Sequence, residues 1–144
     1  MKRMMNTLLS MLICTVLFST CFGATTVCAA PSGKIEIQLK DLNTAHSNKT
    51  GVTFKLYRVG TVLDSGEPVI DPVYGITEYP VTADETEQAV KKIKAALTGS
   101  AQASAATDAS GKAVLSGVAD GIYYIAADES NGYGIVEPLL VQIP

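Results

Sequence analysis

Hydrophobic and polar residues alternate most regularly over residues 33–41. Isoleucine or leucine occupies positions 35, 37 and 39, and glutamate, glutamine and lysine occupy 36, 38 and 40. This is the period of a β-strand with one buried face. A polar, turn-forming stretch at 43–51 separates it from a second predicted strand at 52–59. One face of that strand carries Val52, Phe54, Leu56 and Arg58, and the other carries Thr53, Lys55, Tyr57 and Val59.

Further short strands are predicted between turns rich in glycine, proline and aspartate. A turn at 64–68 precedes a weaker strand at 73–79. Residues 100–110 are rich in alanine, serine and threonine without clear periodicity, so they are expected to form a mobile loop. The remaining strands are predicted at 112–115, 122–127 and 135–143, with turns at 108–111, 117–121 and Asn131-Gly132.

One helix is signalled between these strands. Thr82 or Asp84 can cap it, and the spacing from Thr82 to Glu85 fits a capping box. Acidic residues come first and lysines follow, which suits the helix dipole. Gly99 is the predicted stop. An apolar stripe is formed by Val90, Ile93 and Leu97, and we interpret it as a surface that faces the core rather than a groove for a partner.

Short strands joined by glycine and aspartate turns, with one inserted helix, predict a mainly β fold. The architecture expected from this pattern is an antiparallel β-sandwich. Residues 31–144 would form it as one domain, because 114 residues are enough for a substantial core.

Residues 1–30 have the features of a signal peptide. Lys2 and Arg3 are followed by a mostly apolar stretch at 8–22 and then by small residues. Cleavage could occur after Val27-Cys28-Ala29 or after Cys28-Ala29-Ala30. Two alternatives are an uncleaved membrane anchor and a lipoprotein acylated at Cys21 or Cys28. Thr20 fits poorly in front of an acylated Cys21, because glycine or alanine is usual at that position.

Removal of the signal peptide changes the cysteine content and the net charge of the chain. All three cysteines, Cys14, Cys21 and Cys28, lie within that peptide, so the mature chain is expected to carry no thiol. Without Lys2 and Arg3, nine basic residues remain against 14 acidic ones, a formal charge of −5. An acidic domain argues against nucleic acid or anionic lipid as a partner. After cleavage no membrane-spanning segment is expected.

No arrangement of residues typical of an enzyme stands out, and we expect no catalytic residues, metal or cofactor. His46 is the only histidine and lies in a polar stretch, so a zinc cluster of the cysteine and histidine kind is excluded. Tyr123 and Tyr124 are adjacent in a predicted strand and must face opposite sides, one toward the core and the other exposed or covered by the helix. The other tyrosines, which are expected to pack but could serve as binding contacts, are Tyr57, Tyr74, Tyr79 and Tyr133.

The order of several short motifs resembles one family. They are Gly33-Lys34-Ile35-Glu36-Ile37, Gly51-Val52-Thr53-Phe54-Lys55-Leu56-Tyr57, Thr107-Asp108-Ala109-Ser110-Gly111-Lys112, Gly121-Ile122-Tyr123-Tyr124-Ile125 and Pro138-Leu139-Leu140-Val141-Gln142-Ile143-Pro144. Together they resemble the Cna protein B-type (prealbumin-like) domains of Gram-positive surface proteins, and most of all the N-terminal domain of major pilin subunits.

The resemblance implies an immunoglobulin-like β-sandwich with a structural or adhesive role. Its partners would be other pilin or surface-protein subunits, or a host protein or glycan, with sortase acting if the full chain carries a sorting signal. It also implies a secreted, cell-surface or cell-wall location. The alternative is a released extracellular module that binds glycan or protein without wall anchoring. A secreted hydrolase is a more distant possibility.

Many domains of this family contain an isopeptide bond between a buried lysine and a buried asparagine or aspartate. Here the usual lysine position aligns with Leu39, and Lys40 points to the opposite face. The usual glutamate aligns with Ala127, and Asp128 is one residue away. The final strand that would carry the asparagine is not present. We therefore expect no internal isopeptide bond, with Lys40 kept as the candidate lysine.

The end of the chain also departs from a complete surface protein. No Leu-Pro-x-Thr-Gly motif, hydrophobic tail or terminal basic cluster is present. We favour a longer protein that continues beyond Pro144 over a short secreted protein without an anchor.

Overall fold

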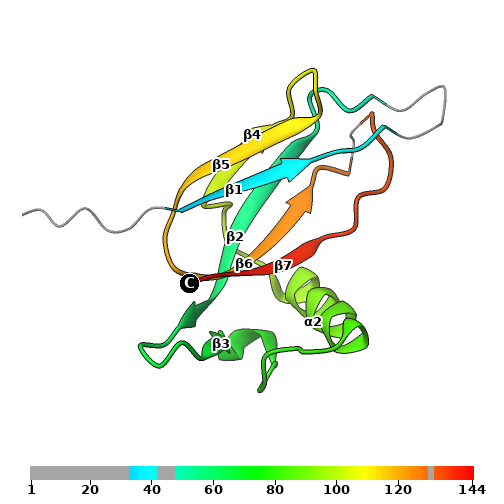
Figure 1. Cartoon of the computed structure of the whole chain (residues 1–144). Coiled ribbons are helices and arrows are strands. Elements are labelled where there is room, and N and C mark those ends of the chain that lie inside the picture. Colours follow the sequence, from blue (N-terminus) through cyan, green and yellow to red (C-terminus); the bar gives the residue numbers. More distant parts are fainter. Residues whose placement is uncertain (1–32, 42–47, 130–131) are drawn as a thin grey trace, which may run out of the picture.

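The described residues form seven β-strands, one α-helix and one 3₁₀ helix, so the fold is mostly β. The computed structural model describes residues 33–41, 48–129 and 132–144 (Figure 1). The elements in chain order are β1 (Gly33–Gln38), β2 (Thr53–Val62), β3 (Pro68–Ile70), the 3₁₀ helix η1 (Pro72–Tyr74), α2 (Ala83–Ala96), β4 (Ala103–Ala106), β5 (Lys112–Val118), β6 (Gly121–Ala127) and β7 (Leu139–Ile143). The predicted signal peptide, His46 and Asn131 lie outside the described residues.

The strands form two sheets. β1 pairs with β5 in the smaller sheet, and the larger sheet has the order β3-β2-β6-β7, with β4 added to β2. Every pairing is antiparallel. Over the residues that the structure describes, the prediction of a mainly antiparallel β fold with one α-helix is therefore confirmed.

The first core lies between the two sheets. Buried side chains from both sheets meet there, and Ile35 and Ile37 of β1 pack against them half-buried. Four residues of the second strand were predicted to share one face. Val52, Phe54 and Leu56 are buried, as predicted for a core face, whereas Arg58 is exposed. The buried members of this cluster are Leu39, Val52, Phe54, Leu56, Ala113, Leu115, Val118, Tyr123 and Ile125.

The second core lies on the opposite face of the larger sheet, under α2. Its buried members are Val59, Ile70, Ile93, Ile122 and Tyr124. Tyr123 belongs to the core between the sheets and Tyr124 to the core under the helix, because neighbouring strand residues point to opposite faces. The sequence predicted that one of the two tyrosines would be either exposed or covered by the helix. Tyr124 is the tyrosine that the helix covers. Val90 and Leu97 pack half-buried beside Ile93, so the apolar stripe faces the core.

A β-bulge turns the far end of β2 toward the helix side. The register with β6 shifts between Arg58 and Gly60, which leaves Val59 as the extra residue. The Arg58 side chain satisfies two backbone carbonyls near the bulge. Its Nε donates to the Gly60 carbonyl at 3.3 Å, and its terminal nitrogen donates to the Asp120 carbonyl at 3.1 Å. The exposed side chain of Arg58 therefore closes the bulge instead of joining a core.

The N-terminus of α2 is capped as the sequence predicts. Thr82 is the N-cap: the Glu85 backbone N–H donates to its hydroxyl at 3.3 Å, and the Glu85 carboxylate accepts from the Thr82 N–H at 3.0 Å. The Glu85 carboxylate also accepts from the Val81 N–H. These bonds satisfy backbone donors that a helix start leaves unpaired and hold the pKa of Glu85 below its usual value.

Replacing Thr82 with alanine is expected to lower the free energy of unfolding by about 1 kcal/mol, because the Glu85 N–H loses its acceptor. Urea unfolding followed by circular dichroism measures the change. Thr77→Ala, at an exposed residue outside the helix, is the matched control and should stay within about 0.5 kcal/mol of the wild type. Equal losses in the two variants would contradict the cap's role.

Several predicted boundaries or elements are wrong. β1 ends at Gln38 instead of residue 41, and β5 continues to Val118 instead of ending at residue 115. Residues 100–110 contain β4, which pairs with Thr53–Leu56 of β2. The predicted strand at 73–79 is replaced by η1, with Pro72 at its start and left-handed Gly75 at its end. The helix ends at Ala96, before the predicted stop at Gly99. The last strand begins at Leu139 instead of residue 135, because Pro138 has no N–H to donate to a ladder.

Candidate functional site

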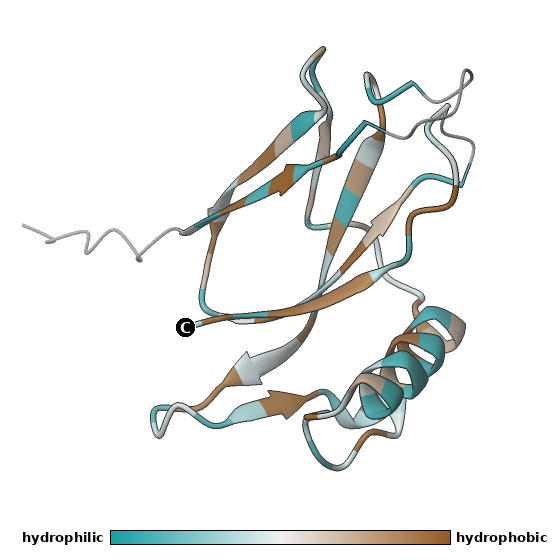
Figure 2. Ribbon diagram, turned by 45° about the vertical axis from the view of Figure 1, so that its right-hand side comes forward, coloured by the Kyte–Doolittle hydropathy of each residue, from teal (hydrophilic) through white to brown (hydrophobic). Residues whose placement is uncertain are grey.

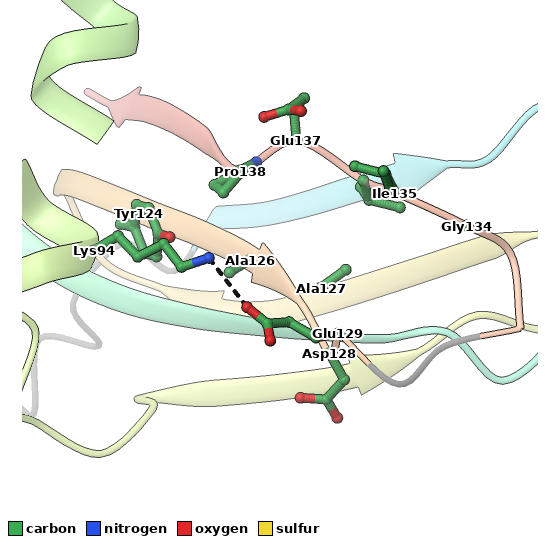
Figure 3. Close-up of a pocket in the computed structure, with 11 residues that line it drawn as sticks. Lys94, Tyr124, Ala126, Ala127, Asp128, Glu129, Gly134, Ile135, Glu137 and Pro138 are labelled. Carbon is green, nitrogen blue, oxygen red and sulfur yellow. Dashed lines mark hydrogen bonds and ion pairs between the residues drawn. The ribbon is translucent and has the colours of Figure 1, made fainter. Parts of the chain in front are cut away.

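A concave feature lies where β7 leaves β6. β6 pairs with β7 only from Gly121 to Ile125, so residues 134–138 arch away from the last part of β6. A cavity of about 590 Å³ lies in this opening, bounded by β6, α2 and the arch (Figure 3). That volume is within the range of small-molecule and peptide side-chain sites.

The cavity combines an apolar base with charged walls. Ala126, Ala127, Val136 and Pro138 supply apolar surface, and Ile135 on the rim is 93 % exposed. Lys94 of α2 reaches across to Glu129 at 3.1 Å (Figure 3). One lysine and three carboxylates line the walls, so the site is acidic overall; the carboxylates belong to Asp128, Glu129 and Glu137.

Three charged residues of the cavity, Lys94, Asp128 and Glu129, form ion pairs. The hydrogen bond to Glu129, with attraction to that carboxylate, raises the pKa of Lys94 and keeps it charged. Asp128 pairs with Lys55 at 2.6 Å, and the Asp128 hydrogen bond raises the pKa of Lys55. Burial raises the pKa of Tyr124. A lysine nucleophile needs a lowered pKa, so these residues suit binding better than covalent catalysis.

A second, smaller cavity of about 280 Å³ lies between residues 75–81 and α2. Its polar groups already serve the local structure. Glu85 accepts the two capping bonds, and Lys92 donates to the Gly75 carbonyl at 3.2 Å. This cavity is therefore explained by the docking of the 75–81 segment on the helix.

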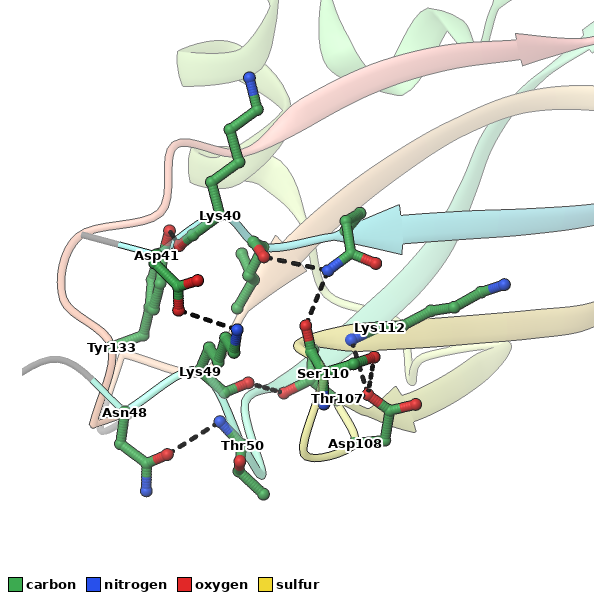
Figure 4. A network of polar contacts seen from close by, with 12 residues as sticks. Lys40, Asp41, Asn48, Lys49, Thr50, Thr107, Asp108, Ser110, Lys112 and Tyr133 are labelled. Atoms are coloured by element: carbon green, nitrogen blue, oxygen red, sulfur yellow. Dashed lines mark hydrogen bonds and ion pairs between the residues drawn. The ribbon is translucent and has the colours of Figure 1, made fainter.

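A network of polar contacts ties the end of β1 to β4 and β5 (Figure 4). Thr107 is its centre and is only 4 % exposed. Its hydroxyl donates to the Lys49 carbonyl at 2.6 Å and accepts from the Val52 N–H at 2.9 Å. Lys49 in turn pairs with Asp41 at 2.8 Å. The network fixes the start of β2 against the turn that joins β4 to β5.

Lys40, the candidate isopeptide lysine, lies beside this network with its side chain exposed and directed away from the core (Figure 4). Leu39, the residue aligned with the usual lysine, is buried and 8 % exposed. The Lys40 carbonyl accepts from the Tyr133 hydroxyl at 2.6 Å. Asp128 is engaged with Lys55, and that pair is half-exposed. The structure therefore does not bring Lys40 and Asp128 together in a core.

Because isopeptide formation needs a buried, neutral lysine, the protein is expected to show the full mass of its mature sequence. An internal bond would lower the intact mass by about 17 or 18 Da, the mass of one ammonia or water. Mass spectrometry of the purified protein, with Lys40→Arg as the control, measures this. A deficit in the wild type that disappears in Lys40→Arg would contradict the expectation.

Asp108 orders the turn between β4 and β5. Its Oδ1 accepts from the Ser110 hydroxyl at 2.6 Å, the Ser110 N–H at 2.8 Å and the Lys112 N–H at 3.0 Å. The Ser110 side-chain bond is the largest cause of a lowered Asp108 pKa. This is an Asx turn, in which the carboxylate substitutes for a backbone acceptor.

A lowered pKa in the folded state contributes stability that is present above the unfolded pKa, near 3.8, and lost as pH falls through the folded value. Asp108→Asn is therefore expected to flatten the loss of stability between roughly pH 5 and pH 2. Urea midpoints across this range measure the effect. Asp64→Asn, in the exposed turn between β2 and β3, removes a carboxylate without touching the Asp108 turn; if both variants respond alike, the assignment is wrong.

The tyrosines mostly pack. Tyr57 and Tyr124 lie on the helix side with ring centroids 6.1 Å apart at 49°. Tyr74 and Tyr79 also pack half-buried against the core under α2. Tyr133 packs against the core between the sheets. The tyrosines therefore pack against the two cores and are not gathered on one exposed face. An exposed cluster of tyrosines would have favoured stacking on a sugar.

Sequence reasoning missed the cavity and its walls. Its residues come from α2, the end of β6 and the arch before β7, and they are dispersed along the chain. The one local signal was Pro138 inside the predicted last strand, since proline interrupts a ladder.

Within residues 33–41, 48–129 and 132–144, no group of three or more histidine, cysteine, aspartate or glutamate residues is placed to hold a metal ion. None of the helices in the same ranges is both long and apolar enough to cross a membrane. Comparisons with protein-family models, with curated proteins and with solved structures gave no match.

Proposed function

We propose that residues 31–144 form a secreted or cell-surface domain with a structural or adhesive role and without enzymatic activity. In this proposal the domain is an immunoglobulin-like β-sandwich of the Cna B-type, similar to the N-terminal domain of a pilin. Its partners are other pilin or surface-protein subunits. Sortase acts on it if the full chain carries a sorting signal.

The observation that carries the proposal is the arrangement of the sheets. Two antiparallel sheets enclose one core, and a helix between β3 and β4 covers the outer face of the larger sheet. The sequence motifs of the resemblance fall on β1, β2, the turn from β4 to β5, β6 and β7. An inserted helix at this place is what the resemblance implies.

The chemistry of the described side chains supports a non-enzymatic role. In the main cavity Lys94 pairs with Glu129, and Asp128 pairs with Lys55 outside the cavity. Two separate apolar cores stabilise the domain, and no cysteine follows Cys28 in the sequence. Stability that needs no disulfide suits an exported domain that must persist outside the cell.

Export is tested by expressing the full chain in a Gram-positive bacterium and fractionating the culture. The protein should appear in the wall or medium fraction with an N-terminus at Ala30 or Pro31. Leu12→Arg, which breaks the apolar stretch of the leader, is the control and should leave the protein inside with Met1 intact. Wild-type protein that stays in the cytoplasm with its leader would refute the proposal.

The alternative, a released module that binds glycan or protein, is favoured by the cavity of about 590 Å³ beside Lys94. Binding of the purified protein to glycan and peptide arrays separates the two roles. A structural domain should show no saturable binding at this cavity. Saturable binding that is lost in Ala126→Phe, with an unchanged circular dichroism spectrum, would replace the structural role with the binding module.

A further inference from the structure

A helical segment covers the second core but buries few of its own side chains. This segment, residues 71–98, contains η1 and α2 and is called the cover. Only Ala89 and Ile93 are buried among the 14 residues of α2, and of these two only Ile93 belongs to the buried cluster of the second core. Figure 2 shows hydrophilic colours along most turns of the helix. The other apolar side chains that the cover packs against this core are half-buried: Tyr74, Ile76, Tyr79, Val90 and Leu97.

Few hydrogen bonds join the cover to the rest of the domain. Within the described residues there are two such bonds. The Asp71 N–H donates to the Val59 carbonyl of β2 at 2.9 Å, where the cover begins. Lys94 donates to Glu129 at 3.1 Å, and the side chains of that pair are 63 % and 88 % exposed. An ion pair so exposed adds little to stability, so the cover is held to the sheet mainly by the apolar contacts around Ile93.

The sheet beneath the cover is held independently of it. β6 forms ladders with β2 on one side and with β7 on the other. The core between the two sheets buries nine side chains, and the cover contributes none of them. Segments with few buried apolar contacts and few hydrogen bonds to their surroundings open at a lower free energy than the whole domain unfolds. The cover is such a segment, and the sheets are not.

We propose that the cover opens as a unit while the two sheets stay folded, so that the domain has a closed and an open state. Hinges are a few loop residues that absorb a change in φ and ψ. Gly99 lies directly after the cover, and no atom lies within 4 Å of the Cβ position there. The backbone at Gly99 can therefore turn without a clash.

Opening changes two surfaces of the domain. Ile122 and Tyr124 of β6 are 0 % and 2 % exposed in the closed state, and they lose Ile93 as a packing neighbour when the cover opens. Lys94 also leaves the cavity of about 590 Å³ that it lines. The position of the cover thus decides whether this cavity is complete. Opening of the cover does not depend on the proposed surface role.

Cysteine labelling tests the opening in the full chain with its three native cysteines changed to serine. Ile122→Cys places the only thiol under the cover, and Leu115→Cys, at a residue that is 1 % exposed in the core between the sheets, is the matched control. Urea unfolding of each variant gives the labelling rate expected from its own global unfolding. Below the unfolding transition, the Ile122→Cys variant should be labelled at least about tenfold faster than that rate. The Leu115→Cys variant should be labelled at it.

Hydrogen exchange of the unsubstituted protein provides a second measurement. Amides of α2 should exchange through an opening that depends only weakly on urea, because opening of the cover exposes less surface than unfolding of the domain. Amides in the centre of β6 should exchange through global unfolding, with the full dependence on urea.

Three results would overturn the proposal. The first is exchange of the α2 and β6 amides with the same free energy and the same urea dependence, which would make the domain one cooperative unit. The second is labelling of the Ile122→Cys variant no faster than its global unfolding allows. The third is early exchange in α2 while position 122 stays protected, which would mean that the helix unfolds in place without uncovering the sheet.

Discussion

Replacing Gly60 with alanine is expected to lower the free energy of unfolding by about 3 kcal/mol. A Cβ at this position would lie 2.3 Å from the Val69 carbonyl oxygen and 2.9 Å from the Ile70 Cα. Both are backbone atoms of β3, so no side-chain rotation relieves the clash. β3 must move away from β2, and buried Ile70 then leaves the core under the helix. Urea unfolding with two spectroscopic probes measures the loss.

Gly99→Ala is the matched control for this prediction. Gly99 has no atom within 4 Å of the added Cβ and does not have a positive φ. It should change stability by less than about 0.5 kcal/mol. If the two alanines had the same effect, the close approach of β3 would not be the reason that position 60 is glycine.

Replacing Ile93 with alanine is expected to cost about 3 kcal/mol, within the range for deleting a fully buried aliphatic side chain. Ile93 is 0 % exposed and is the helix residue at the centre of the second core. Its truncation leaves a cavity among Val59, Ile122 and Tyr124. Amide exchange in α2 should also increase, because the helix depends on this side chain for its docking.

Ile135→Ala deletes the same atoms at a residue that is 93 % exposed. It should leave the free energy of unfolding within about 0.5 kcal/mol of the wild type. A loss at Ile93 no larger than that at Ile135 would mean that the helix contributes little to the stability of the sheet beneath it.

The elements that the sequence predicted well are those with a local signal. β1, β2 and β6 have alternating or continuous apolar residues, and α2 has both a capping box and an apolar stripe. The opposite directions of Tyr123 and Tyr124 also followed from the strand period alone. In each case the residues that carry the signal are within one turn or a few positions of one another.

The elements that it missed depend on partners distant in sequence. β4 is built from alanine and serine, which have no strong strand preference, and it exists because β2 offers its edge to Ala103–Ala106. The cavity beside Lys94 likewise requires α2, β6 and residues 134–138 to meet. No local pattern encodes that meeting, so the candidate site was not predictable from the sequence.

The sequence by itself determined the mainly β character, the position and cap of the one helix, and the burial of alternate residues in the long strands. It also placed every cysteine before residue 29. Only the tertiary structure decided that β2 carries a bulge at Val59 and that Gly60 lies against the backbone of β3. It also decided that β7 begins at Leu139, later than predicted. The physical reason is that propensity, capping and periodicity act between neighbours in the chain, whereas edges, cavities and close backbone contacts arise between segments that folding brings together.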